Sequence, residues 1–306
     1  MSVLKTALTL EDLPSPPPDK SGWPWTKQSQ PLPERMPNGL EWPRISIVTP
    51  SYNQGCFLEA TIRSVLLQGY PNLEYIIIDG GSSDETIEIL NKYSKFLSYW
   101  ISERDRGQTH AINKGLAKSS GEIIGWINSD DLYTSRALLT IASAFRKNPS
   151  VDLIHGNRIL INALGKVTGW SILPKFAPSQ YGYVICSETT FWNRSSMEKV
   201  GLLNESLECA MDLEFFLRIY KIGKFLKLDD FIGYFRYHDS SKSSTLKSQM
   251  HFEATAIWRN EFGEDEKIRI KPKGNIVRYF YTLIKNPFLV CIPYLKGKLQ
   301  KLSSSN

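Results

Sequence analysis

Short apolar runs alternate with segments of helical periodicity in the middle of this chain. The runs that indicate buried strands are Ile45–Thr49, Glu74–Asp79, Tyr99–Ser102 and Glu122–Ile127. The segments that indicate helices are Phe57–Gln68, the stretch through Ile87 and Leu90, and Thr109–Lys118. Strands that alternate with helices favour a mostly parallel sheet with helices on both faces. We therefore expect a Rossmann-like α/β fold.

Polar residues follow each predicted strand at its carboxyl end. They form the segments Thr49–Asn53, Asp79–Asp84, Asp105–Gln108 and Asn128–Asp131. Ligands of open parallel sheets bind beyond the carboxyl ends of the strands. The sequence therefore predicts that these four segments converge on one site.

The strand before Asn128-Ser129-Asp130-Asp131 runs directly into paired carboxylates. Two adjacent carboxylates repel each other unless a cation or a proton neutralises part of their negative charge. Mg²⁺ and Mn²⁺ favour oxygen ligands and often share them with substrate phosphates. The segment therefore indicates metal-held diphosphate chemistry, or alternatively a simple cap on the following helix.

The other polar segments also have two interpretations each. Tyr52 can lie against a nucleotide base, or Thr49–Asn53 is an ordinary turn in which Asn53 caps a helix. Asp79 can accept a hydrogen bond from a base, while Lys114 can reach a phosphate or remain solvated. Neither a GxxxxGK[ST] phosphate loop nor a GxGxxG dinucleotide loop occurs in the chain.

Five segments in this order resemble glycosyltransferase family 2. They are Thr49-Pro50-Ser51-Tyr52-Asn53, Ile78-Asp79-Gly80-Gly81-Ser82-Ser83-Asp84, Asp105-Arg106-Gly107-Gln108, Ala111-Ile112-Asn113-Lys114-Gly115 and Asn128-Ser129-Asp130-Asp131. The resemblance continues more thinly to about Ser243. It implies the GT-A fold and transfer of a sugar, with inversion, from a nucleotide-diphosphate sugar to an acceptor hydroxyl. A UDP-sugar is the expected donor.

The resemblance also implies roles for individual residues. It places the donor on Pro50, Ser51, Tyr52, Asn53, Asp79, Gly107, Gln108, Asn113, Lys114, Asn128, Ser129 and Asp130. Asp79 would recognise the base. Asn128-Ser129-Asp130 takes the place of the family's DxD motif with Asn at its first position, so Asp130 is the expected ligand of Mg²⁺ or Mn²⁺. That ion would bridge the diphosphate and offset its charge.

Two later segments resemble further motifs of the family. Asp212, in Ala210–Arg218, is the expected general base at the start of an amphipathic helix, or alternatively a cap. Burial must keep it basic, because the helix dipole favours its ionised form. The expected buried face is Leu213, Phe216, Leu217 and Tyr220. Glu188 is the second candidate for the base or an acceptor contact.

Arg236-Tyr237-His238 and the serines after it resemble a loop that closes on the diphosphate. His238 is expected to bind metal or phosphate, or to be a structural histidine. Arg236 or Lys242 would neutralise the leaving group. Asp131, adjacent to the metal carboxylate, is a secondary candidate for the site.

The flanking regions differ from this core. Residues 1–44 hold nine of the 17 prolines together with Trp23, Trp25 and Trp42, so part of this arm should pack on the domain. We expect residues 45–150 to bind nucleotide and metal, 151–245 to bind the acceptor, and 246–306 to form a tail.

The tail is the only basic region. The net charge is +6, and residues 267–306 hold nine Lys/Arg and no acidic residue, so residues 1–266 carry −3. General nucleic-acid binding is therefore disfavoured. Phe288–Ile292 among lysines suits an anionic membrane surface, or a basic helix packed on the domain. We expect neither a membrane-spanning segment nor a signal peptide, and the four cysteines form no CxxC pair.

These features predict a cytoplasmic enzyme, peripheral at the inner membrane surface, that acts on a glycan or lipid-linked acceptor. An inactive nucleotide- or sugar-binding homologue is one alternative, because Asn128 and Met211 occupy positions that are acidic in the family. A sugar-1-phosphate nucleotidyltransferase is less favoured, since Ser51–Gly55 lacks the basic residue of that class.

Overall fold

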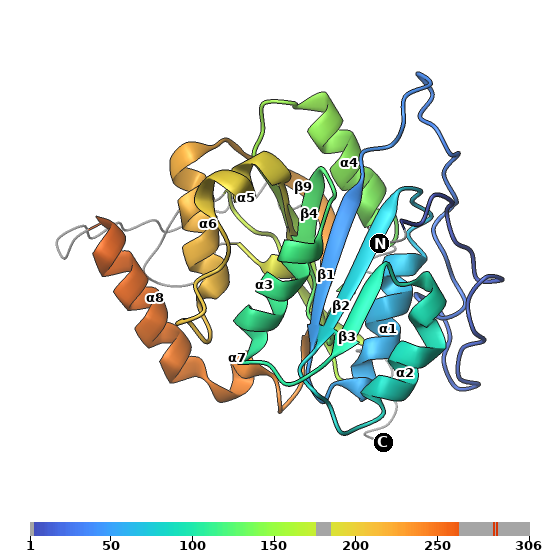
Figure 1. Cartoon of the computed structure of the whole chain (residues 1–306), viewed down its shortest axis with the longest axis horizontal. Coiled ribbons are helices and arrows are strands. Elements are labelled where there is room, and N and C mark those ends of the chain that lie inside the picture. Colours follow the sequence, from blue (N-terminus) through green and yellow to red (C-terminus); the bar gives the residue numbers. More distant parts are fainter. Residues whose placement is uncertain (1–2, 176–184, 263–283, 285, 287–306) are drawn as a thin grey trace.

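The computed structural model describes residues 3–175, 185–262, 284 and 286. A nine-stranded sheet has the order β3-β2-β1-β4-β8-β6-β9-β5, and β7 pairs with β6 (Figure 1). The strands are β1 (Ile45–Ser51), β2 (Leu73–Asp79), β3 (Tyr99–Ser102), β4 (Ile123–Trp126), β5 (Leu132–Tyr133), β6 (Leu153–Asn162), β7 (Val167–Ser171), β8 (Thr190–Asn193) and β9 (Phe225–Tyr237).

The first four strands pair in parallel, as expected from the alternating pattern. Beyond β4 the sheet is mixed. Strand β8 is antiparallel to both β4 and β6, β7 is antiparallel to β6, and β5 is antiparallel to β9, whereas β6 and β9 are parallel. One continuous sheet therefore joins the predicted donor and acceptor halves.

Helices cover both faces of the sheet, as predicted. They are α1 (Gly55–Leu66), α2 (Thr86–Tyr93), α3 (Gln108–Lys118), α4 (Ala137–Lys147), α5 (Arg194–Val200), α6 (Met211–Ile222), α7 (Lys242–Thr245) and α8 (Lys247–Phe262), with 3₁₀ turns η1 (Ser94–Phe96) and η2 (Ser187–Thr189). Successive residues of β2 separate the two cores: Tyr75 and Ile77 pack with α1, α2 and α4, whereas Ile76 and Ile78 pack with α3, α6 and α8. Figure 1 shows α1 and α2 opposite α3.

The N-terminal arm packs on the α1 face, as the tryptophans suggested (Figure 1, dark blue). Leu4 forms a bridge with Leu73 of β2. The Trp23 indole donates a hydrogen bond of 2.8 Å to the Tyr133 carbonyl. Arg63 of α1 is fully buried beneath the arm and donates to the carbonyls of Pro14, Pro24 and Trp25.

The C-terminal region differs in part from the expectation. Residues 247–262, which we assigned to the tail, form α8 and pack through Ala254 and Ile257 on the α6 core. The rest of the basic tail lies outside the described residues, apart from Ile284 and Asn286. No helix among the described residues is long and apolar enough to cross a membrane. Among the described residues, Cys56, Cys186 and Cys209 form no disulfide bond.

Candidate active site

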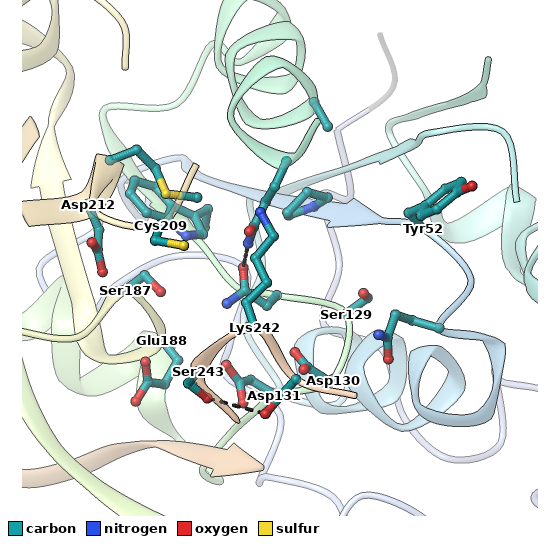
Figure 2. Close-up of a pocket in the computed structure, with 18 of the residues that line it drawn as sticks. Tyr52, Ser129, Asp130, Asp131, Ser187, Glu188, Cys209, Asp212, Lys242 and Ser243 are labelled. Carbon is teal, nitrogen blue, oxygen red and sulfur yellow. Dashed lines mark hydrogen bonds between the residues drawn. The ribbon is translucent and has the colours of Figure 1, made fainter. Parts of the chain in front are cut away.

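A cavity of about 820 Å³ opens at the carboxyl ends of β1 and β4, where the polar segments were expected to converge. Figure 2 shows Tyr52 on one side, Asp212 on the other, and Asp130 and Asp131 between them. The predicted site residues that line the cavity are Pro50, Ser51, Tyr52, Gly107, Gln108, Asn128, Ser129, Asp130, Asp131, Glu188 and Asp212. The cavity has the size and position of a ligand site in an α/β sheet.

In the loop after β1, Tyr52 presents its aromatic ring to the cavity, whereas the next residue, Asn53, has a structural role. Tyr52 is 62% exposed at the cavity wall, so its ring can receive a planar group. Asn53, with φ of 50°, accepts from Ser83 N at 2.9 Å and does not line the cavity. Asp84, not Asn53, accepts from the first N–H of α1, at Gly55. Asn53 therefore ties the β1 and β2 loops together.

Asp79 is fully buried, and the protein's own donors occupy its carboxylate. Its Oδ2 accepts from Gly81 N, Ser82 N and the Ser102 hydroxyl, and its Oδ1 accepts from the Ser82 hydroxyl. The carboxylate does not line the cavity, although Gly80 does. In this structure Asp79 therefore shapes the loop that borders the cavity and does not present its oxygens to a base.

Asp105 lines the cavity, although no role was predicted for it from the sequence. Its Oδ1 accepts from Gly107 N at 2.8 Å, and it lines the cavity beside Gly80. A Cβ at Gly80 would lie 2.7 Å from Asp105 Oδ2, so glycine is needed for this close approach. Its place in a polar loop after β3 is the sequence feature that could have identified Asp105 as a site residue.

Asn113 and Lys114 do not line the cavity. Asn113 is buried and bonds both backbone groups of Leu203, while Lys114 forms an ion pair with Glu103. These two side chains thus hold α3 against neighbouring loops. Gln108, at the start of the same helix, does reach the site, where its Nε2 donates to Asn128 Oδ1 at 2.8 Å.

Asp130 has an imidazole partner, His238. His238 Nε2 lies 2.9 Å from Asp130 Oδ2, and Ser240 holds the other ring nitrogen at 2.9 Å. The Phe57 ring lies 4.7 Å from the imidazole, centroid to centroid. His238 does not itself line the cavity, whereas Asp130 does. The pair therefore forms a carboxylate and a histidine nitrogen that converge at the cavity wall.

Arg236 supports the carboxylate loop from behind, in contrast to the expected contact with the leaving group. Its guanidinium donates to the carbonyls of Asp130, Asn162 and Ala163, and its backbone N–H donates to Asp131 Oδ1. Arg236 is buried and absent from the cavity lining, whereas Lys242 lines the cavity and lies between Asp212 and Asp130 in the view of Figure 2. Lys242 is therefore the better placed of the two expected cations.

Asp131 is the more buried of the two adjacent carboxylates. Its side chain is almost fully buried, and no described residue hydrogen-bonds to its Oδ2. Burial and then the negative charge of Asp130 raise the pKa of Asp131 well above its ordinary value. Burial and the neighbouring Asp130 charge therefore both disfavour the ionised form of Asp131.

Asp212 lies at the start of α6 and is fixed there by aromatic packing. Phe216 stacks on Trp126 of β4 at 5.6 Å, and Phe215 meets Trp192 of β8 edge-on at 5.2 Å. Burial raises the pKa of Asp212 to about 7, although a hydrogen bond from Leu213 N lowers it, and the Glu188 charge raises it further. Burial therefore outweighs the helix dipole, as predicted. The expected burial of Tyr220 is wrong, because its side chain is 42% exposed.

Glu253 of α8 is a supporting residue that sequence reasoning missed. Its carboxylate accepts hydrogen bonds from the backbone N–H groups of Glu208, Cys209 and Ala210, directly before α6. Burial raises the pKa of Glu253, but the hydrogen bond from the Gln249 side chain together with these three backbone bonds outweighs it and lowers that pKa. Glu253 therefore fixes the segment that leads into Asp212.

The family model described as "Glycosyl transferase family 2" matches residues 46–199, half of the chain. The chain belongs to glycosyltransferase family 2. An uncharacterized glycosyltransferase of Mycobacterium tuberculosis is 30% identical over 182 residues, which cover 58% of this chain and 68% of that protein. A PGL/p-HBAD biosynthesis glycosyltransferase of Mycobacterium bovis is 26% identical over 58% of this chain and 70% of its own length.

Solved glycosyltransferases share the fold. S. aureus TarS in complex with UDP-GlcNAc superposes with a TM-score of 0.55 at 19% identity, over 66% of this chain and 61% of that one. The mannosyltransferase PcManGT of Pyrobaculum calidifontis, in complex with GDP-Man and Mn²⁺, has a TM-score of 0.54 at 19% identity, over 70% and 64%. The likeness confirms the expected GT-A fold, and this chain spans less than two thirds of each structure.

Proposed function

We propose that this family member transfers a sugar from a nucleotide-diphosphate sugar to an acceptor hydroxyl, with inversion at the anomeric carbon. The observation that carries the proposal is a half-buried carboxylate, Asp212, with a pKa of about 7 in the same cavity as Asp130. A carboxylate with that pKa is partly deprotonated at neutral pH and can act as a general base.

The donor site extends from Tyr52 towards Asp130. The exposed Tyr52 ring is the proposed platform for the base, which we expect to be uracil. Ser129, Asp130 and Lys242 lie further along the cavity, where the diphosphate would follow. TarS is in complex with UDP-GlcNAc and PcManGT with GDP-Man, which supports a nucleotide-sugar donor but leaves the base to be tested.

A divalent cation, Mg²⁺ or Mn²⁺, fits the Asp130–His238 pair. The two atoms that converge, a carboxylate oxygen and an imidazole nitrogen 2.9 Å apart, are both ordinary metal ligands. No group of three or more acidic, histidine or cysteine ligands occurs within the described part of the chain. Such ions commonly complete their shell with substrate phosphates and water. When bound, the ion would offset the negative charge of the departing diphosphate.

The chain's own residues perform the rest of the proposed step. The acceptor oxygen bonds to the anomeric carbon while the bond from that carbon to the diphosphate oxygen breaks. The acceptor proton passes to the Asp212 carboxylate, and the electron pair of the broken bond leaves with the nucleoside diphosphate. Lys242, at the cavity wall, is placed to stabilise that negative charge.

Calorimetry and a turnover assay together test this proposal. UDP and GDP are titrated with Mn²⁺ or with EDTA into wild type, Asp130→Ala and Asp212→Asn. We expect metal-dependent binding of one nucleotide, loss of that binding in Asp130→Ala, and its retention in Asp212→Asn. Sugar transfer from the matching donor to glycan or lipid-linked acceptors should occur only with Asp212 present. Binding without turnover in wild type would instead indicate an inactive homologue, and no binding would contradict the donor site.

A further inference from the structure

Two buried charges in the cavity have no part in the proposed chemistry. Glu188 of η2 is 2% exposed, and Arg158 of β6 lies beside it with 3.6 Å between Nη1 and Oε1. Both residues line the cavity. Figure 2 shows Glu188 on the Asp212 side, beyond Asp131.

The pair is built into the sheet. Arg158 pairs with Gly233 across β6 and β9, and Glu188 packs directly on that glycine. A Cβ at Gly233 would lie 2.5 Å from the Glu188 carbonyl oxygen and 2.9 Å from its Cγ. The Arg158 guanidinium also lies over the Phe235 ring at 4.7 Å. Glycine at this position therefore opens the space in which the carboxylate meets the guanidinium.

The pair leaves hydrogen-bonding capacity unused. Among the described residues, neither Glu188 Oε1 nor Arg158 Nε has a hydrogen-bond partner. Buried polar groups are nearly always satisfied, and both residues line the cavity, so a ligand group that donates and accepts would complete their hydrogen bonding. Neighbouring hydroxyl groups of a sugar ring do both.

We infer that Glu188 and Arg158 bind hydroxyl groups of the sugar that is transferred, and that this sugar is a neutral hexose. The inference rests on the proposed function, because the anomeric carbon must lie between the leaving diphosphate and the base. Glu188 lines the same cavity as Asp130 and Asp212; burial and then the Asp130 charge raise the pKa of Glu188, and the Glu188 charge adds to the effect of burial on Asp212. A uronic acid is disfavoured, since its carboxylate would meet the negative charge of Glu188, and the opposed charges of the pair suit an uncharged ring.

Calorimetry with matched ligands tests the inference. UDP, UDP-glucose and UDP-glucuronate, with GDP and GDP-mannose in parallel, are titrated with Mn²⁺ into wild type and Glu188→Gln. The exposed Glu198→Gln on α5 is the control for the same chemical change. We expect Glu188→Gln to weaken nucleotide-hexose binding by about tenfold or more. Its affinity for the bare nucleotide should stay within about twofold, as should all affinities of the control.

Charge selectivity gives a second readout. Wild type should bind the glucuronate donor more weakly than the glucose donor, and Glu188→Gln should narrow that difference. If Glu188→Gln loses the bare nucleotide as well, the double variant Arg158→Gln/Glu188→Gln, which leaves no buried unpaired charge, is measured in its place. Equal losses for nucleotide and nucleotide-hexose in both variants would overturn the inference.

Other outcomes separate the inference from the proposed function. Wild type that binds neither nucleotide contradicts the proposed function, and the inference with it. Nucleotide-hexose binding that is unchanged in Glu188→Gln overturns the inference alone. In that case a raised KM for the acceptor would assign the pair to the acceptor sugar.

Discussion

The pKa of Asp212 makes the proposed base testable at the level of one residue. Because burial raises that pKa to about 7, turnover should rise with pH through about 7 and then level off, as the deprotonated form becomes dominant. Asp212→Asn should lower kcat by roughly 10²-fold to 10⁴-fold while nucleotide affinity changes little. Measuring kcat against pH at saturating donor tests the expected pH dependence. A profile that is flat between about pH 5 and pH 8 would exclude Asp212 as the base.

The same carboxylate should make stability depend on pH. Its folded pKa of about 7 lies above its ordinary value of 3.8, so the folded state binds the proton more tightly. Its contribution to stability is therefore complete below about pH 4 and is lost as pH rises to about 7. Each pKa unit corresponds to about 1.4 kcal/mol. As pH rises from about 4 to about 7, the free energy of unfolding of Asp212→Asn should therefore increase by a few kcal/mol relative to that of wild type. Urea unfolding in EDTA at several pH values measures the difference, and parallel curves for the two proteins would contradict it.

Sequence reasoning identified most of the residues at the cavity but not how they are used. The resemblance to the family pointed to Asp130 and Asp212, and both line the cavity. The expected roles of Asp79 and Lys114 differ from the structure, because Asp79 accepts from Gly81, Ser82 and Ser102 while Lys114 pairs with Glu103 of the loop after β3. Side-chain partners of this kind depend on tertiary packing, which local pattern does not specify.

At the level of elements, Glu253 should control the position of α6 from a separate helix. It accepts from the three N–H groups that precede this helix, at 2.8 to 3.0 Å. Glu253→Gln replaces one acceptor oxygen by a donor, so the segment before Asp212 should loosen. We expect kcat to fall by about tenfold, with a smaller change in nucleotide affinity, because small displacements of a base are costly.

A matched control for Glu253 lies on the same helix. Glu261 of α8 pairs with Lys221 near the other end of α6, and Lys221 is half exposed. Glu261→Gln removes a contact between the same two helices but lies away from the base. Its kcat should equal that of wild type. Equal kinetic losses in both variants would show that Glu253 acts only through general docking of α8.

Sequence pattern predicted the elements of the first half better than those of the second. The strands β1 to β4 are short apolar runs with helices between them, and parallel pairing follows from that order. The strands β5, β8 and β9 pair antiparallel, or with a strand far away in sequence, and no local feature specifies those partners. Periodicity also placed Tyr220 on the buried face of α6, where the end of the helix is in fact exposed.

For the whole molecule, the charge asymmetry predicts membrane association through the tail. Nine Lys/Arg residues and no acidic residue lie in residues 267–306, so this region should be attracted to anionic lipid by about 1 kcal/mol per basic residue near the surface. Replacing Lys285, Lys296, Lys298 and Lys301 by Gln should weaken co-sedimentation with phosphatidylserine vesicles and leave nucleotide binding unchanged. If this variant sedimented with the vesicles as well as wild type does, the basic residues of the tail would not be responsible for membrane association.

The arm and the domain should unfold as one unit, because a buried arginine of α1 binds several groups of the arm. Arg63 donates to three carbonyls of the arm and to the Tyr93 hydroxyl, and its guanidinium lies 5.6 Å from the centre of the Trp25 ring. Arg63→Met would leave buried carbonyls without their donor, so we expect a loss of about 3–5 kcal/mol in the free energy of unfolding. Faster proteolysis within residues 5–30 should accompany that loss. The exposed Arg35→Met in the same arm is the control and should change stability by less than about 0.5 kcal/mol. If the two variants were equally stable, the hydrogen bonds of Arg63 to the arm would make no net contribution to the free energy of unfolding.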